Sequence, residues 1–146
     1  MRFLHSMLRV HDLDKSLHFF CDLLGFTETR RWESEQWKCT LVYLAAPDDV
    51  DAAKEKRAPE IELTYNWESD PYTNGNNHGH LAFEVDDIYA VCQKLMDNGV
   101  IINRPPHDGW MAFVKTPDGI SLELLQKGEK LPAREPWASM EKVGEW

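Results

Sequence analysis

The chain has 146 residues, 42% of them hydrophobic and 28% charged, a composition typical of one globular domain with an apolar core. Its formal net charge of -9 at pH 7 argues against binding to nucleic acid or to anionic membranes. No apolar run approaches the roughly 20 residues of a bilayer-spanning helix, and the N-terminus lacks the apolar core of a signal peptide. Three cysteines without C-x-x-C spacing favour neither a disulfide framework nor a thiolate zinc site. We therefore expect a cytoplasmic protein.

The first two predicted elements are a strand and a helix. Residues 3–10, FLHSMLRV, alternate in polarity so that His5 and Arg9 share one face of a strand. A helical pattern follows, with Asp12 as its N-cap and Gly25 as its end. The unit therefore begins with a strand followed by a helix.

Further strands complete this first unit. Residues 40–46, TLVYLAA, predict an intermediate strand, and residues 48–60 predict a charged surface loop with room for one helical turn. The last strand, EIELTYN at residues 60–66, places Glu62 and Asn66 on the same face. The unit thus consists of a strand, a helix and then several strands.

The same order returns in the second half of the chain. Equivalent residues lie at identical distances along the chain from His5 and from His80. They are Val10, Asp12 and Leu13 in the first half and Val85, Asp87 and Ile88 in the second. The last strand of the second half, residues 120–126, carries Glu123 as the first carries Glu62. We interpret residues 1–126 as one domain of two repeats, about 1–68 and 78–126.

Residues 127–146 form a C-terminal tail beyond the repeats. Its prolines predict an irregular path, which is also typical of a disordered end. Trp137, Met140 and Trp146 are costly to leave in water, so we expect the tail to pack on the body or on a partner subunit.

Each repeat carries a histidine on its first strand and a glutamate on its last, namely His5 with Glu62 and His80 with Glu123. Taken singly, His5 reads as a hydrogen-bonded core residue and Glu62 as an exposed strand residue. Their equivalent places in a repeat favour a shared metal site, because two buried carboxylates need a cation. Two imidazoles and two carboxylates suit Ni, Zn, Co, Mn or Fe(II), and four ligands on an octahedral ion leave two positions open. We interpret His78 as a rim residue that could replace or assist a ligand.

Four segments of the chain, in this order and at similar spacing, resemble glyoxalase I (lactoylglutathione lyase) of the vicinal oxygen chelate superfamily. The segments are LHSMLRV, ELTYNW, GHLAF and TPDGISLELL, and the resemblance covers residues 1–126. It implies an α+β fold of two βαβββ modules, with mixed curved sheets and helices outside.

The resemblance also implies an isomerase that converts the methylglyoxal–glutathione hemithioacetal to S-lactoylglutathione through a metal-bound enediolate. Carried over residue by residue, the metal ligands are His5, Glu62, His80 and Glu123. Glu123 is expected to move the proton as a general base, with Glu62 serving the opposite face or the opposite substrate enantiomer. Ni or Co is the favoured metal and Zn is possible.

Glutathione contacts are expected from Arg9 and Asn66, in a homodimer whose site lies at the interface. One position departs from the family pattern, because Asn76 stands where some members have a basic residue that holds a glutathione carboxylate. A related enzyme acting on another thiol adduct therefore stays open, as does a non-catalytic binding protein on the same fold. An extradiol dioxygenase is disfavoured because Glu62 adds a fourth ligand where that chemistry needs open positions.

Overall fold

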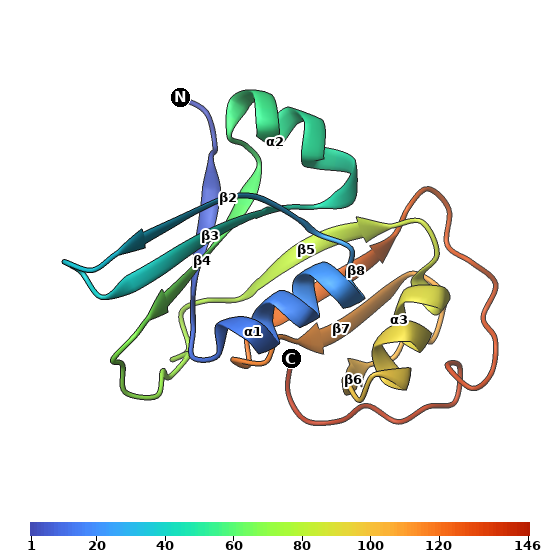
Figure 1. Cartoon of the computed structure of the whole chain (residues 1–146). Helices are drawn as coiled ribbons and strands as arrows, with labels where there is room; N and C mark the ends of the chain where they lie inside the picture. The colour runs from blue at the N-terminus through green and yellow to red at the C-terminus, as the bar shows by residue number, and fades with distance from the viewer. The chain divides into compact units, whose positions relative to one another are not determined.

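Alternating hydrophobic residues fold each half of the chain into its own four-stranded sheet (Figure 1). The computed structural model describes residues 1–146, which divide into two compact units, Met1–Thr73 and Asn74–Trp146. No helix has the length and apolar character needed to cross a bilayer.

The first unit contains a mixed sheet in the order β1-β4-β3-β2, in which β1 and β4 run parallel. Its strands are β1 (His5–Val10), β2 (Thr27–Ser34), β3 (Cys39–Ala45) and β4 (Glu60–Asn66). Its helices are α1 (Leu13–Leu17), which continues as a π-helical turn η1 (His18–Leu23), the 3-10 turn η2 (Pro47–Asp49), and α2 (Val50–Lys56). The segment expected to be a charged loop therefore contains a helix of two turns, α2.

The second unit repeats this arrangement with the sheet order β5-β8-β7-β6, and β5 and β8 again run parallel. Its elements are β5 (His80–Val85), α3 (Ile88–Asp97), β6 (Ile102–Arg104), β7 (Met111–Lys115) and β8 (Ser121–Gln126). One face of α3 is fully buried and the helix contacts β6, β7 and β8. Each fully buried Ile or Leu on that face contributes about 1.5–3 kcal/mol.

Local signals in the sequence set the ends of the two equivalent helices. The Asp12 carboxylate accepts a hydrogen bond from the Lys15 amide, and the Asp87 carboxylate accepts from the amides of Tyr89 and Ala90. Gly25 and Gly99 both have φ of +80°, as a left-handed helix end requires. The fold prediction of two βαβββ modules is confirmed; the repeat boundaries at 1–68 and 78–126 stay a prediction.

The C-terminal tail packs on the body of the second unit. Trp137 is only 2% exposed, whereas Trp146 keeps 41% of its surface accessible. Close to the start of the tail, the Leu131 amide donates to the Gly109 carbonyl at 3.1 Å. A Cβ added to Gly109 would lie 2.1 Å from the Leu131 carbonyl oxygen, so only glycine lets the tail approach here.

We predict that Gly109→Ala lowers the free energy of unfolding more than Gly99→Ala does. Both glycines have positive φ, which costs an alanine about 1–2 kcal/mol. An alanine methyl group at position 109 would also collide with the tail, and this overpacking adds about 1–3 kcal/mol. Nothing lies within 4 Å of a Cβ at Gly99. Urea unfolding followed by circular dichroism measures both losses, and equal losses would show that the tail does not pack at Gly109.

Candidate metal and substrate site

The first unit brings His5 and Glu62 together. Parallel pairing sets His5 opposite Glu60 and Met7 opposite Glu62, so both side chains leave the same face of the sheet. The His5 Nε2 lies 3.0 Å from the Glu62 Oε2, with the histidine 32% and the glutamate 12% exposed. An accessible imidazole therefore stands beside a largely buried carboxylate.

The second unit brings His80 and Glu123 together in the same register. His80 pairs with Ser121 and Ala82 pairs with Glu123, which repeats the two-residue offset of the first unit. The His80 Nε2 lies 3.1 Å from the Glu123 Oε2. The four predicted ligands thus form two pairs, one in each unit, and no group of three or more His, Cys, Asp or Glu side chains is placed to hold a metal.

The donor spacing within each pair fits a divalent ion. Two neighbouring ligands about 2.1 Å from an octahedral metal lie about 3 Å apart. The observed separations of 3.0 and 3.1 Å match that distance, and they also suit a hydrogen bond when no metal is bound. Each pair could therefore supply two adjacent nitrogen and oxygen ligands with little rearrangement.

An aromatic ring supports each histidine from a third strand. His5 meets Tyr43 edge-on, with ring centroids 5.6 Å apart, and His80 meets Phe113 edge-on at 5.3 Å. These rings are equivalent in register, since Tyr43 pairs with Glu62 and Phe113 pairs with Glu123. The contacts hold each imidazole on the face that carries its carboxylate.

The two carboxylates differ in their other neighbours. Glu62 accepts a hydrogen bond from the Thr64 hydroxyl at 3.0 Å. Burial raises the pKa of Tyr43, and the Glu62 carboxylate beside its phenol raises that pKa further. The equivalent neighbours of Glu123 are Leu125 and Phe113, which have no hydroxyl group. A hydroxyl group therefore restrains the Glu62 carboxylate, whereas Phe113 and Leu125 offer no such hydrogen bond to Glu123.

A buried ion pair lies behind the first histidine–glutamate pair. The side chain of Glu60 has no exposed surface and accepts hydrogen bonds from Arg30 and from the Thr29 hydroxyl. The Arg30 guanidinium also covers the Tyr43 ring, 3.5 Å from its centroid. In the second unit Ser121 replaces the glutamate, and the equivalent Arg104 donates to the Met111 carbonyl.

The other predicted site residues lie as follows. Arg9 is exposed on the face of β1 that carries His5, and it pairs in register with Thr64. The Asn66 amide donates to the Tyr72 hydroxyl at 3.0 Å. His78 is exposed just before β5, outside the His80 pair.

The cysteines supply none of these donors. Cys39 and Cys92 are buried, and burial raises the pKa of Cys92 to about 12. Cys21 is half-buried, and its pKa is also raised, chiefly by burial. Thiolate ligands, which need a lowered pKa, are therefore not part of this site.

Three neighbours of the site were not assigned from the sequence: Tyr43, Thr64 and the Arg30–Glu60 pair. Tyr43 meets Glu62 only through the pairing of β3 with β4. Counting equivalent positions in the two repeats does not predict this contact, because the first unit has the additional helix α2 between β3 and β4. Arg30 and Arg104 do follow their glycines by the same five residues, which was the available signal.

We predict that Arg30→Ala destabilises the protein by about 3 kcal/mol or more, because it leaves the buried Glu60 carboxylate uncompensated. The matched control is Arg104→Ala, which removes a hydrogen bond to a carbonyl and should cost about 1 kcal/mol. Replacing Glu60 by Ser in the Arg30→Ala background should recover much of the loss. Denaturant unfolding measures all three variants, and similar losses at both arginines would contradict the buried charge pair.

Comparisons with known proteins match nearly the whole chain. The family model described as "Glyoxalase/Bleomycin resistance protein/Dioxygenase superfamily" matches residues 2–124. A probable lactoylglutathione lyase of Vibrio cholerae is 43% identical over 130 residues, which cover 86% of this chain and 90% of the relative. The lactoylglutathione lyase of Haemophilus influenzae is 43% identical over 131 residues, covering 86% and 93%.

A solved structure agrees with the sequence relatives. The trypanothione-dependent glyoxalase I of Leishmania major superposes with a TM-score of 0.75 at 34% identity, covering 87% of each chain. Family model, relatives and fold all point to the same group of enzymes. The chain therefore belongs to the glyoxalase superfamily and, within it, to the lactoylglutathione lyase (glyoxalase I) family.

Proposed function

We propose that the protein is a metal-dependent lactoylglutathione lyase that converts the methylglyoxal–glutathione hemithioacetal to S-lactoylglutathione and so removes methylglyoxal. The observation that carries this proposal is the repeated imidazole–carboxylate pair, in the same register in both units of a chain related to such enzymes. We expect the enzyme to work in the cytoplasm.

One divalent ion is proposed to bind both pairs, with His5, Glu62, His80 and Glu123 as its ligands. The all-nitrogen-and-oxygen donor set supports Ni or Co, with Zn as a further candidate. When bound, such an ion polarises the substrate carbonyl and stabilises the negative charge that develops on it.

Glu123 is proposed as the general base. The reaction removes a proton from the carbon that bears sulfur and returns it to the neighbouring carbon, so the base must move between two positions. The side chain of Glu123 contacts His80, and its neighbours Phe113 and Leu125 have no hydroxyl group that would fix it in one position. Glu62 is held by the Thr64 hydroxyl and suits a fixed ligand, or the base for the opposite face of the substrate.

Arg9 and Asn66 are proposed to bind the glutathione part of the substrate. Both lie on the face of the first sheet that carries His5 and Glu62. Arg9 is exposed and offers a guanidinium to a carboxylate, and Asn66 offers a polar amide already positioned by Tyr72. Their position supports substrate contact.

We propose further that the protein is a homodimer with its site at the interface. Each unit supplies only two of the four ligands, so a complete metal site needs both kinds of pair. In a twofold dimer, the first pair of one chain can complete the second pair of its partner.

The second candidate is the same reaction on an adduct of another thiol. Asn76 supplies no positive charge for a glutathione carboxylate, and the Leishmania major relative is described as trypanothione-dependent. Parallel assays with both thiol adducts distinguish the two. Glutathione is the expected co-substrate, because the relatives that match over most of their length carry the name lactoylglutathione lyase.

We predict that the metal-stripped protein is inactive on the preformed hemithioacetal and that Ni²⁺ or Co²⁺ restores thioester formation. At saturating metal, Glu123→Gln should lower kcat by about 10²–10⁴-fold, because the amide cannot accept the proton. The matched variant Glu62→Gln should weaken metal binding while retaining more of kcat. Absorbance of the thioester measures turnover, and calorimetry measures metal affinity.

Two results would contradict this assignment. Equal loss of kcat in both variants at saturating metal would remove the special role of Glu123. A wild-type protein that binds a metal tightly yet stays inert on both thiol adducts would favour the non-catalytic binding protein.

We predict that mixed subunits recover activity lost in each parent. His5→Ala damages the first pair and Glu123→Gln damages the second. If each site combines pairs from two chains, half of the reassembled dimers are mixed, and one of their two sites is intact. Activity should then rise to about a quarter of the wild-type value. No recovery, despite mixed dimers seen by native mass spectrometry, would place all four ligands within one chain.

A further inference from the structure

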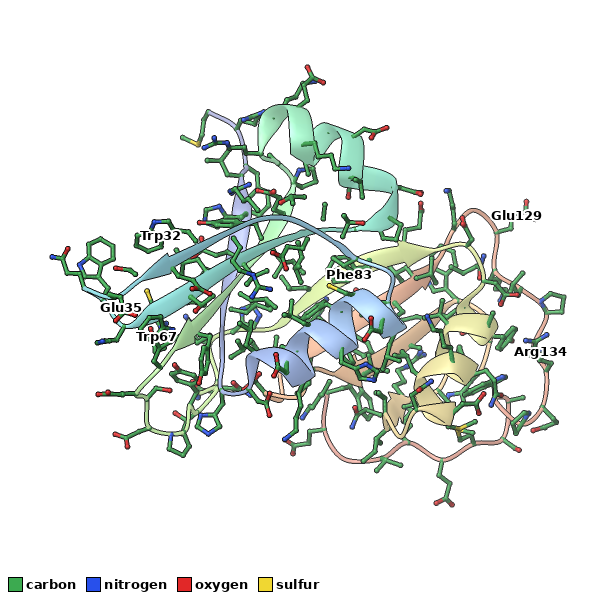
Figure 2. The ribbon with its side chains drawn as sticks, in the orientation of Figure 1. Trp32, Glu35, Trp67, Phe83, Glu129 and Arg134 are labelled. Carbon is green, nitrogen blue, oxygen red and sulfur yellow. The ribbon has the colours of Figure 1, made fainter.

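The C-terminal tail, residues 127–146, is anchored to the second unit at Tyr89 of α3. The Tyr89 hydroxyl donates to the Pro132 carbonyl at 3.0 Å. The buried Trp137 stacks on the same ring at a centroid distance of 6.4 Å, and the Arg134 guanidinium lies 4.2 Å from the ring centre. Figure 2 labels Arg134 in this part of the tail, beyond α3. The middle of the tail is therefore packed.

A second anchor holds the tail at the strand β6. The Val143 amide donates to the Asn103 carbonyl at 2.8 Å, and the Asn103 side-chain amide donates to the Val143 carbonyl at 2.9 Å. His107 also contacts the Met140 carbonyl through its Nε2, at 2.8 Å. These contacts fix the backbone shortly before Trp146, and the tail ends beside β7 (Figure 1).

The second anchor places Trp146 on the face of the sheet that carries the His80–Glu123 pair. Its indole lies 6.3 Å from the Phe113 ring, and Phe113 in turn supports His80 at 5.3 Å. Phe113 is only 7% exposed, whereas Trp146 keeps 41% of its surface accessible. Two ring contacts thus connect the exposed indole to the proposed metal ligand.

The first unit has a different group at the corresponding place. There the Arg30 guanidinium covers Tyr43, the ring equivalent to Phe113. The Arg30–Glu60 ion pair therefore lies beside the His5 pair, and an apolar indole lies beside the His80 pair. The two halves of the proposed site offer a polar side and an aromatic side.

Resting on the proposed function, we infer that Trp146 is a specificity-determining residue. The tail carries its indole next to the His80–Glu123 pair, where it contacts an apolar, above all an aromatic, substituent on the oxoaldehyde part of the adduct. An exposed aromatic ring of this kind gains stacking with a flat substituent and gains little with a methyl group.

Trp146→Ala tests this role through the choice between two substrates. We expect the ratio of kcat/KM for the phenylglyoxal adduct to that for the methylglyoxal adduct to fall about three- to tenfold, because stacking is lost. Trp146→Phe should keep most of the ratio. The matched control is Trp110→Ala, since Trp110 lies just before β7 and is 39% exposed, close to the 41% of Trp146.

A second measurement locates the indole independently of catalysis. Co²⁺ quenches the emission of nearby tryptophans, and the emission of Trp146 is the difference between the wild type and Trp146→Phe. We expect Co²⁺ to reduce the emission of Trp146, obtained as this difference, by more than half. If Co²⁺ quenches Trp146 in a protein that turns over neither adduct, the proposed isomerase activity is wrong, but the position of Trp146 beside the metal site is supported. An unchanged ratio in an active Trp146→Ala variant, or an unquenched difference after Co²⁺ binding, would overturn the inference.

Discussion

Parallel pairing of the first and last strand of each unit sets an imidazole beside a carboxylate, and the proposed chemistry depends on that pairing. The histidine and the glutamate come from strands about forty to sixty residues apart in the chain, yet their Nε2 and Oε2 atoms lie 3.0 and 3.1 Å apart. A register shift of one residue would turn either side chain to the opposite face of its sheet. The sheet is therefore part of the site.

The duplicated units are alike in backbone and unlike in the chemistry around the pair. In the first unit the Thr64 hydroxyl donates to the Glu62 carboxylate, and the Arg30 guanidinium covers the neighbouring Tyr43 ring. In the second, Glu123 has Phe113 and Leu125 as neighbours, with Trp146 beyond. This difference supports different roles for the two carboxylates, with Glu62 as a fixed metal ligand and Glu123 as the mobile general base. A twofold site of equal halves would lack any preference for one face of the substrate.

Much of the fold was predictable, because the helix caps Asp12 and Asp87 and the glycines after the helices are local signals. The histidine–glutamate partners followed from the repeat. The strand β2 lacks apolar alternation, since its sequence TETRRWES is largely polar, and β6 has only three residues. Tyr43 became a neighbour of Glu62 only through long-range register, which no local pattern contains. The place of Trp146 likewise depends on tail contacts at Asn103 and Tyr89.

The proposed chemistry requires both pairs to bind one ion. X-ray absorption spectroscopy of the cobalt-loaded protein, together with metal analysis, counts the imidazoles around each cobalt and the cobalt atoms per chain. We expect one cobalt per chain, bound by nitrogen and oxygen atoms that include two imidazoles. One imidazole per cobalt, with two cobalt atoms per chain, would show that each pair binds its own ion and would rule out a shared metal site.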